Sequence, residues 1–135
     1  MKRSSLLGAA SAALIAVACG GGAAKLERAP ILPPANPQAL GKMVQAVQSA
    51  NEKQKAIALL RDAVKIDPNL WEARYNLGVL LAQVGDFAEA EQELSKTQSL
   101  APNAEDVVVA LGEVRRRLED PKGAVSVLEP FVKAN

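Results

Sequence analysis

A period of 34 residues is the feature of this sequence that most restricts its fold. The unit from residue 71 to residue 104 reads WEARYNLGVLLAQVGDFAEAEQELSKTQSLAPNA, and a shift of 34 residues in either direction finds matching positions. Leu60, Leu94 and Leu128 form one column of the repeat. A repeat of this length is one supersecondary unit that buries its apolar face only by stacking on neighbouring units. We therefore expect three stacked units, over residues 37–70, 71–104 and 105–135.

The spacing of apolar residues within the units predicts helices. Apolar side chains recur at i, i+3, i+4 and i+7, as in the set Leu77, Leu80, Leu81 and Val84, and no strand pattern competes. Small residues in repeat register are expected to let adjacent helices approach closely, and these are Gly78, Ala90, Gly112 and Ala124. Residues with capping side chains precede the expected helices, and these are Asn36, Asn51, Asn69, Asp86 and Asp120.

One column of the repeat is irregular. Leu40 and Val108 occupy equivalent positions in the outer units, whereas the middle unit has Arg74 there.

The middle unit resembles the tetratricopeptide repeat family. The resemblance lies in its period, in the pair Leu77-Gly78, in the turn formed by residues 85–87, in Ala90, and in residues 101–103 at its end. It implies an all-α fold, a right-handed α-solenoid of three helix-turn-helix repeats. It also implies a concave groove, lined mainly by the first helix of every repeat, that binds a partner protein.

The family pattern places particular residues in this groove. From the middle unit we expect Glu72, Tyr75, Val79, Ala82 and Gln83; from the third, Asp106, Val109, Glu113 and Arg116; and from the first, Gln38, Gly41, Gln45 and Gln48. One subgroup of the family clamps acidic peptide C-termini with lysine, arginine and asparagine. Only Asn76 fits that pattern here, and Gly41 and Asp106 stand where lysine would be needed. Binding of acidic chaperone tails is therefore not expected.

Two further groups of side chains allow alternative interpretations. Trp71 and Tyr75 are four residues apart and share a helix face, so they either anchor a partner or, for Trp71, pack against the end of the preceding unit. The run Arg115, Arg116 and Arg117 lies near an expected helix C-terminus, where the dipole favours cations. It is either a solvated helix end or a contact for an acidic partner.

Composition argues against catalysis and nucleic-acid binding. The chain has no histidine and one cysteine, which excludes histidine-dependent acid-base chemistry and nearly every zinc site. Sixteen basic and fifteen acidic side chains leave no charge bias towards a phosphate backbone. We therefore expect no enzyme activity, no cofactor, no metal site and no nucleic-acid partner.

The N-terminus carries an export signal. Lys2 and Arg3 precede the apolar run Leu6–Val17, which is shorter than the roughly 20 residues that a bilayer span needs. Ala18 and Cys19 follow this run, and the whole segment resembles a bacterial lipoprotein signal. That resemblance implies a signal peptide over residues 1–18 and a Cys19 that carries acyl chains such as palmitate. The alternative is an ordinary signal cleaved near Ala18, with an unpaired thiol.

Residues 19–36 are expected to form a tether between the lipid and the repeats. The three glycines at 20–22 favour a flexible linker, because neither a strand nor a Gly-Lys-Ser/Thr sequence accompanies them as in a phosphate-binding loop. Pro30, Pro33 and Pro34 extend the rest of the tether. Gly20 replaces the aspartate that marks inner-membrane retention in enteric lipoproteins, which favours the periplasmic face of the outer membrane.

These features predict a non-catalytic, lipid-anchored scaffold that binds another cell-envelope protein and aids an outer-membrane machine for pili, motility or secretion. The alternative is a membrane-associated structural or self-assembling protein. Apolar residues are expected on the outer face of the last helix, namely Val125, Val127, Leu128, Phe131 and Val132. Because repeat stacks need a polar end, we expect either that the array continues beyond Asn135 or that this face pairs with a partner or a second copy.

Overall fold

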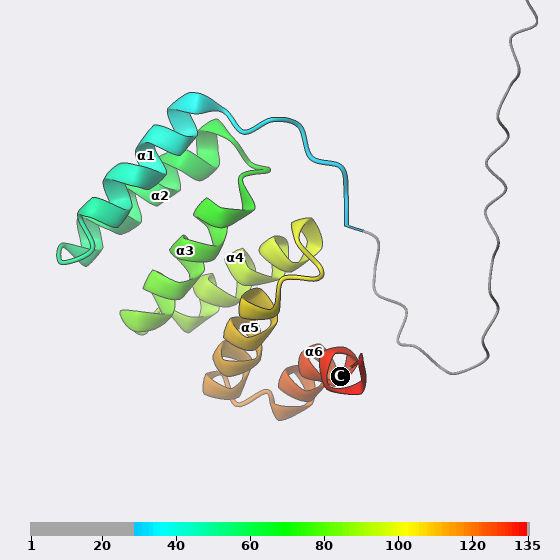
Figure 1. Cartoon of the computed structure of the whole chain (residues 1–135). Helices are drawn as coiled ribbons and strands as arrows, with labels where there is room; N and C mark the ends of the chain where they lie inside the picture. The colour runs from blue at the N-terminus through cyan, green and yellow to red at the C-terminus, as the bar shows by residue number, and fades with distance from the viewer. Residues whose placement is uncertain (1–28, 135) are drawn as a thin grey trace, which may run out of the picture.

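The computed structural model describes residues 29–134, and within this range every regular element is an α-helix (Figure 1). The helices are α1 (Pro37–Gln48), α2 (Lys53–Ile66), α3 (Trp71–Gln83), α4 (Phe87–Leu100), α5 (Glu105–Arg117) and α6 (Pro121–Ala134). The expected signal peptide, Cys19 and the first part of the tether lie outside the described residues.

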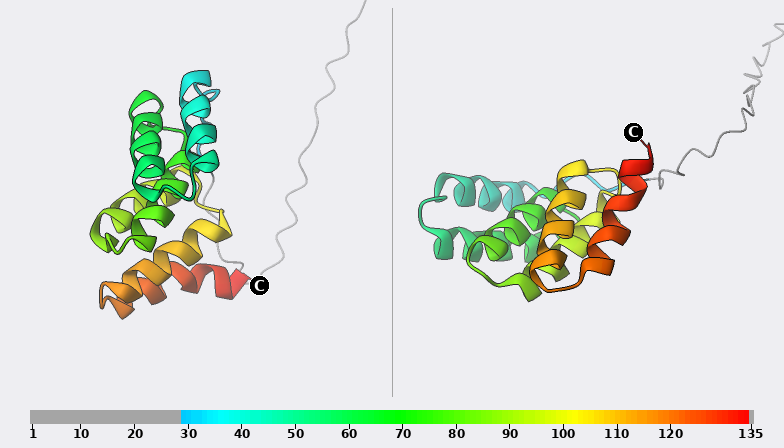
Figure 2. Two further views of the ribbon diagram at one scale, coloured as in Figure 1. Left: turned by 90° about the vertical axis from the view of Figure 1, so that its left-hand side faces the viewer. Right: turned by 90° about the horizontal axis from the view of Figure 1, so that it is seen from below.

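The helices form three antiparallel hairpins that stack in chain order. Within each repeat α1 packs on α2, α3 on α4 and α5 on α6, and between repeats α2 packs on α3 and α4 on α5. Figure 2 follows the same order along the stack, with α1 at one end and α6 at the other. The all-α solenoid of three helix-turn-helix units is therefore confirmed.

The helices of a repeat approach each other closely at small residues. A Cβ atom built on Gly78 of α3 would lie 2.7 Å from Cγ of Leu94 on α4. Gly112 of α5 also lies close to α6, since its Cβ would lie 3.1 Å from Cδ1 of Leu128. Ala90 and Ala124, on the second helices, are both buried. Any larger side chain at the two glycines would push the paired helices apart or displace a leucine.

The core is continuous along the stack and consists mainly of alanine and leucine. Leu60, Leu77, Leu81, Leu94 and Leu111 are its largest fully buried side chains. Leu60 and Leu94 occupy the same repeat column, which explains why the 34-residue period preserves leucine there.

Two of the predicted helix caps are present. The Asn36 side chain accepts hydrogen bonds from the backbone N–H groups of Gln38 (2.9 Å) and Ala39 (3.4 Å) at the start of α1. Asp120 accepts one from the N–H of Gly123 (2.9 Å) at the start of α6. Both caps precede a proline at the first helical position, where a missing N–H costs nothing.

The other three caps were predicted wrongly. Helix α2 begins two residues after Asn51, and α3 begins two residues after Asn69. Asp86 does precede α4, but its side chain makes no capping hydrogen bond. For Asn69 the cause is local: its N–H donates to the Asp67 carboxylate at 3.0 Å, which makes a turn before the helix.

The irregular column is explained by an ion pair inside the middle repeat. Arg74 Nη1 lies 2.6 Å from Glu93 Oε2 on α4, and both side chains are only 12% exposed. Arg74 Nε also donates to the backbone oxygen of Pro68 at 2.9 Å. The arginine therefore ties α3 to α4 and to the preceding turn, where the outer repeats have an aliphatic residue.

The outer face of the last helix is less apolar than expected. Val127 is buried, and Leu128 and Phe131 pack against the core, so their predicted exposure was wrong. Val125 and Val132 are exposed at 61% and 75%. The helical period explains the division, because residues 124, 127, 128 and 131 share one face and residues 125 and 132 share the other.

Candidate protein-binding groove

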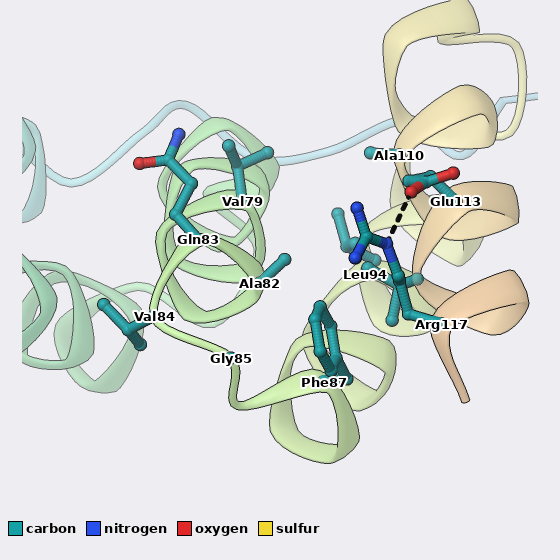
Figure 3. Close-up of a pocket in the computed structure, with 11 residues that line it drawn as sticks. Val79, Ala82, Gln83, Val84, Gly85, Phe87, Leu94, Ala110, Glu113 and Arg117 are labelled. Carbon is teal, nitrogen blue, oxygen red and sulfur yellow. Dashed lines mark hydrogen bonds and ion pairs between the residues drawn. The ribbon is translucent and has the colours of Figure 1, made fainter.

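A pocket of about 630 Å³ opens between α3 and α5, with the start of α4 at its base (Figure 3). We call it the apolar pocket, because aliphatic and aromatic side chains form most of its wall. Its lining residues are Val79, Ala82, Gln83, Val84, Gly85, Phe87, Leu94, Ala110, Glu113, Val114 and Arg117.

Charged side chains from α5 border this pocket. The Arg117 guanidinium carbon lies 6.0 Å from the centre of the Phe87 ring, and Nε of the same side chain donates to Glu113 at 2.9 Å. Arg116 also donates to Glu113, at 2.8 and 2.7 Å. Hydrogen bonds from the two arginines lower the pKa of Glu113 to about 2. One carboxylate thus serves two guanidinium groups, which leaves a positive excess at this end of the groove.

A second pocket, of about 440 Å³, lies between the N-terminal ends of α3 and α5. We call it the acidic pocket, because three carboxylates line it and no basic side chain does. Its residues are Trp71, Glu72, Tyr75, Asn76, Ala104, Glu105, Asp106 and Val107. Burial raises the pKa of the Tyr75 hydroxyl, and the negative charge of Asp106 raises it further.

The two pockets divide the predicted groove residues. Glu72, Tyr75 and Asp106 line the acidic pocket, and Val79, Gln83 and Glu113 line the apolar pocket, as does Ala82. Val109 and Arg116 line neither and are exposed on α5. Gln38, Gly41, Gln45 and Gln48 are exposed on α1 and also line neither. The structure therefore brings seven of the nine groove positions expected from the middle and third units into one groove between α3 and α5.

Several residues that line the two pockets were missed from sequence. Val107, Ala110, Val114 and Arg117 face α3, and each lies one residue beyond a position taken from the family pattern. Their spacing of three and four residues marks one helix face and could have identified them. The sequence assigned Phe87 only to a turn. Its ring reaches the pocket because the α3–α4 hairpin folds back on itself, which the local sequence pattern does not reveal.

The three consecutive arginines have three different environments. Arg115 crosses to α4 and lies 3.0 Å from Glu91 Oε1, so it is structural. Arg116 pairs only with Glu113 on its own helix face among the described residues. Arg117 borders the apolar pocket. The interpretation as a plain solvated helix end is therefore wrong for Arg115, whose side chain is only 22% exposed.

Trp71 lies between the acidic pocket and a smaller pocket of about 250 Å³. Leu32, Pro33 and Ala35 of the segment before α1 line the smaller pocket together with Leu40 and Leu70. The same segment is tied down where the N–H of Asn36 donates to the Asp67 carboxylate at 2.8 Å. Trp71 thus borders the end of the preceding repeat and also the groove.

Residues 29–134 contain neither a helix suited to span a membrane nor a cluster suited to bind a metal. No helix there is both long enough and apolar enough to cross a bilayer. The acidic side chains of that range form no group that could hold a metal ion.

Comparison with known proteins identifies the fold. The sequence profile of the tetratricopeptide repeat matches residues 50–111, whereas no curated protein matches the chain. The crystal structure of MamA is 21% identical, with a TM-score of 0.68 over 72% of this chain and 58% of MamA. The second tetratricopeptide domain of Spaghetti (RPAP3), bound to the HSP90 peptide SRMEEVD, is 16% identical, with a TM-score of 0.68 over 73% of this chain and 94% of that domain.

The chain therefore spans a little over half the length of MamA and nearly all of the Spaghetti domain. At these identities the likeness concerns the fold. The profile match, the three stacked hairpins and the glycine contacts agree with one another: residues 50–111 match the tetratricopeptide repeat family, and the described residues have its solenoid fold.

Proposed function

We propose that this protein is a non-catalytic scaffold that binds another cell-envelope protein through the groove between α3 and α5. The observation that carries the proposal is the pair of adjoining pockets in this groove, which offers an apolar cavity and a charged one along a single line. Grooves with an apolar centre and a polar rim are suited to binding a protein segment. The second tetratricopeptide domain of Spaghetti, which has a similar fold, is bound to a peptide.

The groove can be tested by photo-crosslinking in the cells that make the protein. A photoreactive amino acid at Gln83, in the groove, is expected to capture an envelope protein. The same amino acid at Lys65, exposed on α2, is the matched control and is expected to capture none. Equal capture from both positions, or capture from Lys65 alone, would contradict a role for the groove.

We further propose that the protein is anchored by acyl chains on Cys19 at the periplasmic face of the outer membrane, where it aids assembly of a pilus, motility or secretion machine. Support comes from the apolar run before Cys19 and from the glycine that follows it. Replacement of Cys19 with serine should remove both acylation and signal cleavage. Fractionation of cells is expected to find the variant as an uncleaved precursor or in the soluble fraction, and processed, membrane-bound Cys19→Ser protein would refute the anchor.

A second candidate function is self-assembly, which one observation favours. Both end helices of the stack carry exposed apolar side chains, Val44 and Val47 on α1 and Val125 and Val132 on α6. Such faces are normally covered in repeat proteins.

A further inference from the structure

The groove between α3 and α5 has a charge polarity. At its N-terminal end the acidic pocket contains Glu72, Glu105 and Asp106. None of these carboxylates forms a salt bridge with another residue in the range 29–134. At its C-terminal end Arg116 and Arg117 share the single carboxylate of Glu113. A cation is therefore more favourable at the N-terminal end of the groove than at its C-terminal end.

Aromatic side chains reinforce this preference at the acidic end. Trp71 and Tyr75 line the same pocket as the carboxylates. A lysine or arginine of a partner would meet both opposite charge and aromatic faces there, and the two attractions act together.

The apolar pocket supplies the second recognition element. Val79, Ala82, Leu94 and Val114 surround a space of about 630 Å³, and Figure 3 places the Phe87 ring between the α3 and α5 sides of it. This volume is in the range of sites that bury whole ligands, so it accepts a leucine-sized or aromatic side chain. The Arg117 guanidinium already makes a cation–π contact with the Phe87 ring. A second cation at this ring would therefore add no further contact of that kind.

The distance between the pockets sets the spacing of the two elements. On both α3 and α5 the linings are centred about eight residues apart, which corresponds to about 12 Å along a helix. An extended chain covers about 3.3 Å per residue, so this distance spans three to four residues.

We propose that the groove binds an extended segment of a separate partner protein that carries a large apolar side chain and, three or four residues from it, a lysine or arginine. The inference rests on the proposed role of the groove in protein binding and adds the chemistry of the partner. The inference predicts that this groove prefers a basic peptide. The peptide bound to the Spaghetti domain, in contrast, carries two adjacent glutamates.

The test uses the purified full-length chain and fluorescent peptides in a glycine-serine background. Each peptide carries one leucine and one lysine, one to six residues apart and in both orders, and binding is measured by fluorescence anisotropy. We expect the tightest binding at spacings of three and four. Replacing the lysine with glutamate, or the leucine with serine, should each weaken binding by about tenfold.

Variants of the protein assign each preference to its pocket. Glu72→Gln with Asp106→Asn should remove the preference for lysine and keep that for leucine, and Val79→Gln should do the reverse. Glu52→Gln with Glu129→Gln makes the same change in net charge outside the groove and should leave both preferences intact. Circular dichroism confirms that each variant is folded.

The remaining outcomes overturn the inference. They are binding that does not depend on spacing, a preference for glutamate, or an equal response of the groove and control variants. Residues 24–33 of this chain, AKLERAPILP, form one further probe, because they carry a basic residue three positions before an apolar one. If this probe alone binds, the occupant is the chain itself and not a partner. If no peptide binds while crosslinking from Gln83 still captures an envelope protein, the partner chemistry is wrong and the role of the groove stands.

Discussion

Two helical glycines of this protein have opposite surroundings. A Cβ atom on Gly78 would lie 2.7 Å from the buried Leu94, whereas a Cβ atom on Gly41 would meet no atom within 4 Å. Gly78→Leu is therefore expected to lower the free energy of unfolding by about 1–3 kcal/mol through overpacking. Gly41→Leu should raise it, by up to about 1 kcal/mol, because leucine is the better helix former. Urea denaturation of both variants measures the difference, and equal effects at the two glycines would contradict the helix contact.

Tyr75 reports on the electrostatics of the groove. It is the single tyrosine of the chain, so an absorbance titration observes it alone. Burial is the larger cause of its raised pKa, and Asp106 is the smaller. In the folded protein Tyr75 should ionise above its ordinary pKa of 10.0, and Asp106→Asn should lower that pKa only part of the way back. Glu52→Gln is the control for net charge, and an equal shift in both variants would place Asp106 away from Tyr75.

At the scale of residues, the sequence predicted positions better than partners. The repeat register identified Gly78 and Gly112 as places of close approach, and the structure puts Leu94 and Leu128 against them. The same register marked Arg74 as irregular without indicating Glu93, because an ion pair depends on how two helices face each other. Repeat columns record which residue types recur and do not record which neighbours they touch.

The elements of the middle repeat are joined by the pair of Arg74 and Glu93. Arg74→Met removes a hydrogen-bonded charge at a largely buried site and is expected to lower the free energy of unfolding by about 1–3 kcal/mol. Lys96 Nζ lies 3.4 Å from Glu93 and still compensates part of its negative charge in the variant. The loss of stability is therefore expected to stay within this range. Adding Glu93→Gln should cost less than the two single losses combined, because the variants share one interaction.

Thermal and urea melts of this double-mutant cycle test the pair. Lys55→Met, in an exposed pair with Glu52, is the control and should change stability much less. Strict additivity of Arg74→Met and Glu93→Gln would show that the two side chains are not coupled.

At the scale of elements, the number of helices and their pairing followed from the period of apolar residues. The residue at which each helix begins could not be predicted from the sequence in every case. Asn36 and Asp120 cap their helices next to a proline, which fixes the first turn, whereas Asn51 and Asn69 lie in turns without such a constraint. Asp67 decides the second case, since its carboxylate accepts a hydrogen bond from the N–H of Asn69 and makes a turn before the helix.

At the scale of the whole molecule, the sequence predicted the order in which the helices stack. It predicted which helices line the groove, but not every residue that lines it. The family pattern assigns groove positions from the first helix of each repeat, yet the apolar pocket also depends on Phe87 and Leu94 of α4. Whether a residue of α5 faces α3 depends on the rotation of α5 about its axis, and packing of Leu111 and Val114 into the core sets that rotation. This is why Val109 and Arg116 stand outside the pockets.

The ends of the stack expose apolar residues in helical register. Leu40, Val44 and Val47 form one stripe on α1, and Val125 and Val132 form another on α6. Because the two stripes belong to opposite ends of the stack, contact between α6 of one copy and α1 of the next would be heterologous and could repeat. We expect the protein to self-associate in this manner, with an average mass in sedimentation that rises with concentration.

Two substitutions distinguish this arrangement from a symmetric dimer. Val44→Lys and Val125→Lys should each abolish association, because every head-to-tail contact needs both stripes. A mixture of the two variants should form dimers and nothing larger, since the intact α6 of the first can bind the intact α1 of the second. Val109→Lys, exposed at 54% in the groove region of α5, is the control and should associate like the unmodified protein. Association that survives either single variant would indicate an interface that uses one end twice, and a protein that stays monomeric at all concentrations would remove self-assembly as a function.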